Sequence, residues 1–308
     1  MQNFFVSVIV PNYNHAKYLD LRMQTILNQT YRNIEVIVLD DKSSDNSIEI
    51  INKYKGDNRV KEIVVNKQNC GSPFLQWKKG FNLAKGDYIW IAESDDFCDI
   101  NFLEIVLKAF DNKKCVLSFS RSIITNSNGI PQKLVHFQRN NDEPSSLIGK
   151  EFVKRHMKFG NYVYNASSVV FRKDVLNKIP LDYCNYKGCG DWLFWIYIAE
   201  LGEVNMIPQL LNNFRRHSSA TTSKLDSDGI NDTEMLRIYD YLNKKNYYSR
   251  IDRVIFKIKR LNFHSQRCQF TTLEDKRRFE REWHITKVTY LMQYLYNVIK
   301  DILASFVR

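Results

Sequence analysis

The chain lacks any uninterrupted apolar run long enough to cross a lipid bilayer, which predicts a globular protein that does not span a membrane. Its first residues lack the basic and apolar regions of a secretory signal peptide, so we expect the protein to be made and kept in the cytoplasm. The six cysteines are scattered and form no CxxC pair, which argues against a zinc site and favours reduced thiols.

The composition allows a large core and places most of the net charge at one end. Of the 308 residues, 44% are hydrophobic and 26% are charged, enough for one large domain or a domain with an appendage. The formal net charge is +11. Sixteen Lys and Arg and seven Asp and Glu lie in residues 237–308, so nine of the eleven net charges belong to the C-terminal quarter.

Apolar residues near the C-terminus recur at intervals of three and four, which predicts an amphipathic helix. They are Val288, Leu291, Met292, Leu295, Val298, Ile299, Ile302, Leu303 and Phe306. Such a helix either packs on its own domain or lies on an anionic membrane surface, and the sequence leaves both open. A nucleic-acid partner is not expected, because no recognised nucleic-acid-binding motif accompanies the basic residues.

The first part of the chain alternates between short apolar runs and segments of helical spacing. We expect strands at residues 6–10, 34–39, 60–65 and 88–92, and helices at residues 17–28, 47–54 and 74–84. This βαβ alternation predicts an α/β fold with a mostly parallel central sheet covered by helices on both faces. Ligands of such sheets bind beyond the carboxyl ends of the strands.

Three of these strand ends are polar. They are residues 11–14 (PNYN), 40–45 (DDKSSD) and 93–96 (ESDD). Turns and helix N-caps account for part of this polarity. However, the adjacent acids Asp40 and Asp41 repel each other unless hydrogen-bond donors surround them, and a nucleotide has such donors. The acids of residues 93–96 form a cluster that suits a hard cation.

Taken together, the segments VIVPNYN (8–14), LNQTY (27–31), VLDDKSSD (38–45) and ESDD (93–96) resemble a family 2 glycosyltransferase with the GT-A fold. Gly71, residues 80–86 and GDW (190–192) are similar to the family as well, so the resemblance covers roughly residues 6–220. It implies transfer of a sugar, most often from a UDP-linked donor, to an acceptor hydroxyl with inversion at the anomeric carbon. Glu93 and Lys42 depart from the commonest pattern, which has Asp and Gly there.

The resemblance also implies a division of the chain. Residues 1–227 form the GT-A domain, with a nucleotide-sugar half at about 1–115 and an acceptor half at about 116–227. Residues 228–308 form a basic helical extension. A glycan or lipid-linked glycan acceptor at the inner face of the membrane would place the enzyme in polysaccharide, lipopolysaccharide or other surface glycan biosynthesis.

Roles follow from the resemblance residue by residue. Pro11 and Asn12 border the nucleotide, Asp41 meets its base, Asp95 approaches the ribose and Asp96 ligates Mn²⁺ or Mg²⁺. A divalent ion stabilises the charge that develops on a leaving diphosphate.

Two later motifs complete the predicted site. Asp191 is the candidate general base for the acceptor hydroxyl, although an Asp before an apolar helix is also an ordinary N-cap. Arg216 and His217 lie on a polar segment that resembles the family's lid, with Arg216 at the diphosphate and His217 on the metal. A solvated surface loop is the alternative for Arg216.

Residues 115–190 are expected to hold the acceptor, with a strand at 115–120 and an irregular polar stretch at 130–165, but no acceptor residue is predicted. A sugar nucleotidyltransferase is the alternative activity, yet VPNYN (10–14) lacks the glycine expected of its phosphate loop. A non-catalytic binding protein is a third alternative, and the intact Asp96, Asp191 and His217 argue against it.

Overall fold

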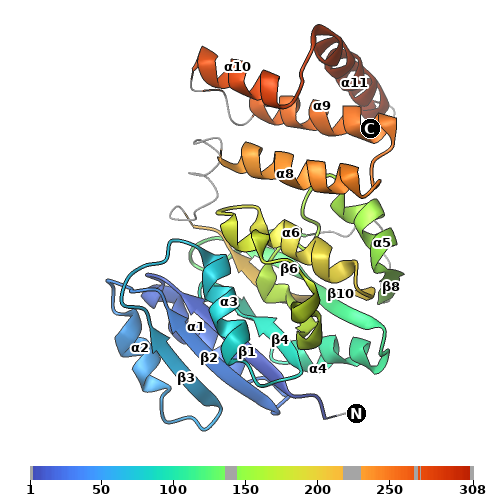
Figure 1. The fold of residues 1–308 in the computed structure, drawn as a ribbon. Helices are drawn as coiled ribbons and strands as arrows, with labels where there is room; N and C mark the ends of the chain where they lie inside the picture. Colours follow the sequence, from blue (N-terminus) through green and yellow to red (C-terminus); the bar gives the residue numbers. More distant parts are fainter. Residues whose placement is uncertain (1–2, 136–143, 218–229, 267–269, 271, 306–308) are drawn as a thin grey trace. The chain divides into compact units, whose positions relative to one another are not determined.

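The computed structural model describes residues 3–135, 144–217, 230–266, 270 and 272–305 (Figure 1). The chain divides into two compact units, Met1–Ala220 and Thr221–Arg308. The boundary predicted after residue 227 lies outside the described residues and stays a prediction, as does the division of the first unit into a donor half and an acceptor half.

Half of the sheet in the first unit is parallel, as the βαβ alternation predicted. Its strands are β1 (Val6–Asn12), β2 (Ile34–Asp40), β3 (Val60–Val65) and β4 (Tyr88–Ile91), in the order β3-β2-β1-β4. The helices α1 (Ala16–Leu27), α2 (Ser47–Lys53) and α3 (Pro73–Leu83) connect them. β1 and β2 are buried along their whole length and are mostly apolar, and their buried Ser7 and Glu35 are hydrogen-bonded to each other at 2.6 Å.

The other half of the sheet is mixed. From β4 the order continues through β9 (Val169–Arg172), β6 (Cys115–Thr125), β10 (Glu203–Arg215) and β5 (Phe97–Cys98). Only β6 and β10 are parallel to each other in this half. The predicted α/β fold is confirmed, and antiparallel pairing adds further strands beyond β4.

The prediction of an irregular stretch at residues 130–165 was wrong. In its described part lie β7 (Pro131–Leu134), β8 (Ser145–Ile148), α5 (Gly149–Phe152) and a π-helical turn (Val153–Met157). β7 pairs with β6 and β8 pairs with β10, both at the margin of the sheet. Short polar edge strands carry too little apolar alternation to be recognised from sequence.

The two faces of the sheet are covered by different helices, because alternate residues of a strand point to opposite faces. On one face Val8 and Val10 pack in a core with α1, α2 and α4 (Phe102–Leu107). On the other face Ile9 meets α3 so closely that a Cβ on Gly80 would lie 2.5 Å from its side chain. Helix α6 (Gly190–Ala199) joins α3 there through stacked rings of Phe81 and Phe194.

The second unit consists, in its described residues, of the helices α8 (Ile230–Lys244), α9 (Arg250–Gln266), α10 (Leu273–Glu282) and α11 (Lys287–Ser305). The ring of Trp283 stacks on Phe256 and Phe279, with 5.6 Å between centroids in each pair. Asp232 is paired with Arg260, and it lies 2.8 Å from His264 Nε2. Within the described residues, none of the helices has the length and apolar character needed to cross a membrane.

Gly149 provides a direct test of the packing between α5 and α6. A Cβ at this position would lie 1.6 Å from the carbonyl oxygen of Ala199, a backbone atom that cannot rotate away. We expect Gly149→Ala to lower the free energy of unfolding by about 2 kcal/mol or more, measured by urea denaturation. Gly56→Ala is the matched control, because nothing lies within 4 Å of its added Cβ. Equal stability of the two variants would contradict this packing.

Candidate active site

The ends of β1 and β2 are joined by side-chain hydrogen bonds at the carboxyl edge of the sheet. Asn12 stands beside Asp40 in the parallel register, and its Nδ2 donates to Asp40 Oδ2 at 2.7 Å. Asp40 also accepts from the backbone N of Ser43 at 2.8 Å and from its Oγ at 2.6 Å. Asn12 Oδ1 is buried and has no hydrogen-bond partner among the described residues, so it could accept from a ligand.

Asp41 holds the loop that leads into α3. Its carboxylate accepts from Asn66 Nδ2 at 2.6 Å, Gln76 Nε2 at 2.7 Å and the backbone N of Cys70 at 3.0 Å. The protein itself therefore supplies the hydrogen-bond donors that the adjacent acids Asp40 and Asp41 require. A nucleotide is not needed to supply them. Lys42, at the position where the family often has Gly, has a φ of 66°, a conformation that glycine adopts without strain.

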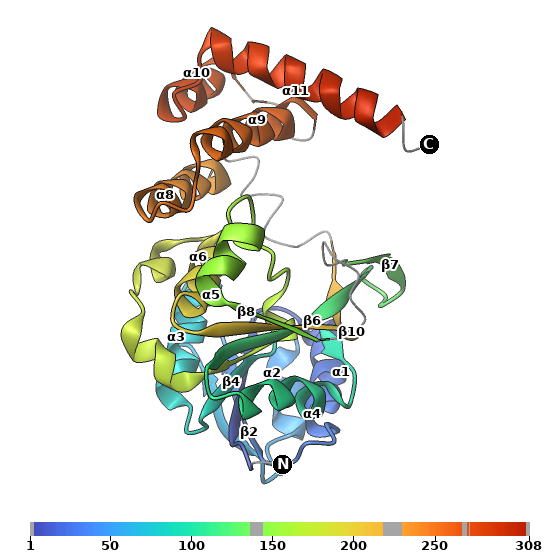
Figure 2. The same cartoon turned by 90° about the vertical axis from the view of Figure 1, so that its right-hand side faces the viewer.

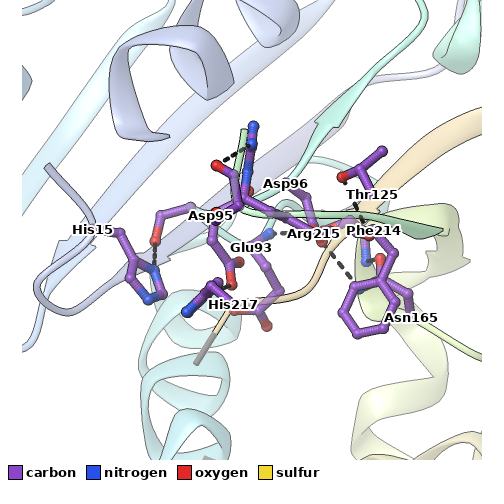
Figure 3. A network of polar contacts seen from close by, with 12 residues as sticks. His15, Glu93, Asp95, Asp96, Thr125, Asn165, Phe214, Arg215 and His217 are labelled. Atoms are coloured by element: carbon purple, nitrogen blue, oxygen red, sulfur yellow. Dashed lines mark hydrogen bonds and ion pairs between the residues drawn. The ribbon is translucent and has the colours of Figure 1, made fainter. Parts of the chain in front are cut away.

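The three carboxylates that follow β4 have different surroundings (Figure 3). Asp96 is only 1% exposed and accepts from Asn165 Nδ2 at 2.9 Å, Ser167 Oγ at 2.6 Å and the backbone N of Arg215 at 2.9 Å. Glu93 accepts from Trp77 Nε1 at 2.9 Å. Asp95 turns instead toward His217, whose Nε2 lies 3.0 Å from Asp95 Oδ2.

Burial and neighbouring charges give these three acids different pKa values. Burial, with the charge of Asp95 added, raises the pKa of Glu93 to about 8 and the pKa of Asp96 to about 7. Burial also acts to raise the pKa of Asp95, but the hydrogen bond from His217 and the nearby charge of His15 outweigh it and hold that pKa below its usual value. Of the three acids, Asp95 is therefore the one that ionises most readily.

A metal-capable group forms around Asp95. His15, Asp95 and His217 each offer one ligand atom, and these atoms lie within 4.8 Å of one another. A carboxylate with two imidazoles, completed by oxygens of a diphosphate, is a donor set that fits Mn²⁺ better than Mg²⁺. The side chain of Asp96, the predicted metal ligand, is instead enclosed by protein donors.

His15 was not recognised from the sequence. It precedes α1 immediately after the turn at Asn14, and its Nδ1 lies 2.8 Å from Ser94 Oγ. Burial lowers the pKa of His15, which favours the neutral imidazole that can ligate a cation. A single His in a turn gives no sequence signal, because its partners Ser94 and His217 lie far along the chain.

Arg215 and Arg216, which precede His217, have different surroundings. Arg215 is buried, with its guanidinium 4.6 Å from the ring centre of Tyr18, and its Nε donates to the backbone O of Asp95 at 2.7 Å. Arg215 therefore holds the backbone of the acidic turn at residues 93–96. Arg216, the predicted diphosphate ligand, is exposed and lies with Nη2 3.5 Å from Tyr164 Oη. The polar residues 218–223 of the predicted lid lie outside the described residues.

Asp191 lies in the first turn of α6 but is not its N-cap, a position that Cys189 occupies. Its Oδ1 accepts from the backbone N of Trp192 at 2.7 Å, and its Oδ2 accepts from Asn161 Nδ2 at 2.8 Å. Gly190 stands where the family often has a second acid. A Cβ there would lie 2.7 Å from both the Phe74 ring and the carbonyl oxygen of Tyr183, so this fold has no room for that side chain.

Residues 161–167 contact several of the predicted site residues. No residue of this segment was itself predicted to belong to the site. Asn161 binds Asp191, Tyr164 contacts Arg216, and Asn165 and Ser167 bind Asp96. One segment therefore sets the candidate base, the exposed arginine and the acidic turn relative to one another.

A buried arginine lies near the acids of residues 93–96. Arg22 of α1 is fully buried, and its side-chain nitrogens have no hydrogen-bond partner among the described residues. Its guanidinium lies 5.0 Å from the ring centre of Trp90. Its charge acts to lower the pKa of both Glu93 and Asp96, against the larger effect of burial. Arg22 thus offsets part of the negative charge of the turn.

Comparison with known proteins identifies the family of the chain. The sequence pattern of Glycosyl transferase family 2 matches residues 7–179, more than half of it. The chain belongs to this family. It is therefore a glycosyltransferase, as the strand-end motifs predicted.

Relatives of this family 2 glycosyltransferase cover it to different extents. GlyG, a glycosyltransferase of Streptococcus pneumoniae, is 42% identical over 109 residues, which is 35% of this chain and 36% of GlyG. An uncharacterized glycosyltransferase of Nostoc is 26% identical over 263 residues, 80% of this chain and 78% of that protein. Poly(ribitol-phosphate) β-N-acetylglucosaminyltransferase TarP of Staphylococcus aureus is 27% identical over 199 residues, 62% of this chain and 56% of TarP.

Solved structures support the GT-A fold. Residues 1–349 of TarS from S. aureus, in complex with UDP-GlcNAc, superpose with a TM-score of 0.67 at 19% identity, over 90% of this chain and 79% of that one. At this identity the likeness shows the fold alone.

Proposed function

We propose that this glycosyltransferase moves a sugar from a UDP-linked donor to a hydroxyl of a surface glycan, with inversion and with a divalent cation. The observation that carries the proposal is the group of His15, Asp95 and His217 at the carboxyl edge of the parallel strands. Residues 161–167 tie the neighbouring Asp96 to Asp191, so a cation site and a carboxylate base belong to one constellation.

The related proteins support the donor and acceptor classes. TarS has been crystallised with UDP-GlcNAc, and the name of TarP describes an N-acetylglucosaminyltransferase that acts on poly(ribitol-phosphate). We therefore propose a UDP-sugar donor and a glycan polymer acceptor, in a pathway of surface polysaccharide synthesis that draws on cytoplasmic nucleotide sugars.

Each residue has a distinct role in this proposal. Pro11 borders the nucleotide together with Asn12, whose buried Oδ1 has no hydrogen-bond partner among the described residues, and Asp41 holds the loop beside the base. Asp95, His15 and His217 would hold Mn²⁺, which supplies Lewis-acid stabilisation of the leaving diphosphate. Arg216, exposed beside Tyr164, would add positive charge for the diphosphate.

The general base is Asp191. It takes the proton of the acceptor hydroxyl as that oxygen attacks the anomeric carbon opposite the leaving group. Asn161 and the backbone N of Trp192 bind one oxygen each, which fixes the plane of the carboxylate before the acceptor arrives. In the proposed mechanism Asp191 alone removes the proton of the acceptor hydroxyl.

Product analysis tests the function. With Mn²⁺ and a panel of UDP-sugars, we expect release of UDP that increases when a glycan acceptor is present, measured by a coupled nucleotide assay. Pyrophosphate in place of UDP would show a sugar nucleotidyltransferase instead. Binding of UDP-sugar and acceptor without turnover would show a non-catalytic protein.

A further inference from the structure

Helix α11 packs against α9 through its polar side. Gln293 Nε2 donates to Asn262 Oδ1 at 2.8 Å, and Asn297 Nδ2 donates to the same oxygen at 3.0 Å. Asn262 in return donates to Asn297 Oδ1 at 2.8 Å. Thr289, on this side of the helix, is buried.

The opposite side of α11 is apolar and exposed. Nine large apolar or aromatic side chains on it are between 37% and 66% exposed, namely Val288, Leu291, Met292, Tyr294, Leu295, Val298, Ile299, Ile302 and Leu303. A helix on the surface of a globular protein normally buries its apolar side and exposes its polar side. α11 does the reverse, and an exposed apolar face of this extent is typical of a docking surface.

Basic side chains lie at the N-terminal end of this face. Arg277, Arg281 and His284 line a shallow pocket with Glu280, Ile285 and Thr286, and the exposed Lys287 begins α11. The acid in the pocket is already engaged, because Glu280 accepts from Tyr290 Oη at 2.6 Å and lies 3.9 Å from Lys276. Helices α10 and α11 lie on the same side of α9 (Figure 2), and the pocket adjoins the start of α11, because Ile285 and Thr286 line it.

We propose that α11 lies in the surface of an anionic lipid bilayer, with its apolar face at the boundary between headgroups and acyl chains. The pocket of Arg277 and Arg281 then binds lipid phosphates beside it. Charge decides between a membrane and a second copy of the chain. The second unit, Thr221–Arg308, contains 17 Lys and Arg and 11 Asp and Glu, a net charge of +6, so an anionic surface attracts this unit whereas an identical unit repels it.

Vesicle sedimentation of the full-length chain tests the proposal. We expect binding to vesicles of phosphatidylglycerol and phosphatidylcholine, weaker binding to phosphatidylcholine alone, and a loss of binding as salt is raised. The double variant Leu295→Glu/Ile299→Glu removes apolar contact from the centre of the face. It should bind anionic vesicles at least about ten-fold more weakly, because buried apolar area supplies much of the binding.

Two controls keep the result specific. Ile251→Glu changes a side chain of α9 that is 71% exposed and lies outside the α11 face, so it should leave vesicle binding unchanged. Arg281→Glu should weaken binding to anionic vesicles only. Vesicle binding that survives the double variant would overturn the proposal. So would a chain that ignores vesicles and self-associates in sedimentation velocity until the double variant makes it monomeric, because α11 would then be an interface between copies.

Discussion

Asp191→Asn is expected to lower the rate of sugar transfer by about 10²- to 10⁴-fold while leaving the affinity for the donor nearly unchanged, since loss of a general base acts on the chemical step. The amide keeps the size of the carboxylate and can still accept from one neighbouring N–H, but it cannot take a proton from the acceptor. Steady-state transfer rates and UDP affinity by calorimetry provide the two measurements.

The control for this prediction lies on the same helix. Glu200→Gln removes a carboxylate from the C-terminal end of α6, one helix length away from Asp191. It should transfer sugar at close to the normal rate. If Asp191→Asn retained normal turnover, the base would have to be another group.

The clustering of several candidate residues could be predicted because the carboxyl ends of parallel strands share one edge of a sheet. Asn12 and Asp40 are the last residues of β1 and β2, Asp41 follows directly, and the register of the two strands brings Asn12 beside Asp40. The same rule placed the acids of residues 93–96 at the end of β4. Local sequence was enough for these residues because the strands that carry them are buried and continuous.

The orientation of the acids could not be predicted. Asp95 and Asp96 are adjacent and chemically alike, and which of them lies beside His217 depends on donors from distant segments. Asn165 is 69 residues from Asp96, and His217 is 122 residues from Asp95. Single Asn, Ser and His residues in loops carry no periodic signal, so Asn165, Ser167 and His15 were missed.

The sequence pattern of helix α11 also left one feature unpredicted, namely which side of the helix packs on the protein. The spacing of its apolar residues predicted a helix, and the structure has one at Lys287–Ser305. Periodicity identifies an apolar side without saying whether protein covers it. Only the pairing of Asn262 with Gln293 and Asn297 reveals that the polar side is the packed one.

Asp95→Asn is expected to abolish the stabilisation that Mn²⁺ adds to UDP binding, and with it most of the transfer activity. The group of His15, Asp95 and His217 contains a single carboxylate, so an amide there removes the only formal negative charge that the three residues offer a cation. A thermal-shift titration of UDP with and without Mn²⁺ measures the effect, because a ligand that binds only the folded state raises its stability.

Asp96→Asn is the matched comparison and should fail differently. The Asp96 carboxylate accepts three hydrogen bonds in a buried position, and an amide cannot accept all of them without turning its NH₂ toward a donor. We expect a loss of about 1–3 kcal/mol in stability with the Mn²⁺ dependence of UDP binding retained. The reverse pattern, with Mn²⁺ dependence lost in Asp96→Asn and kept in Asp95→Asn, would make Asp96 the metal ligand, as the family motif implies.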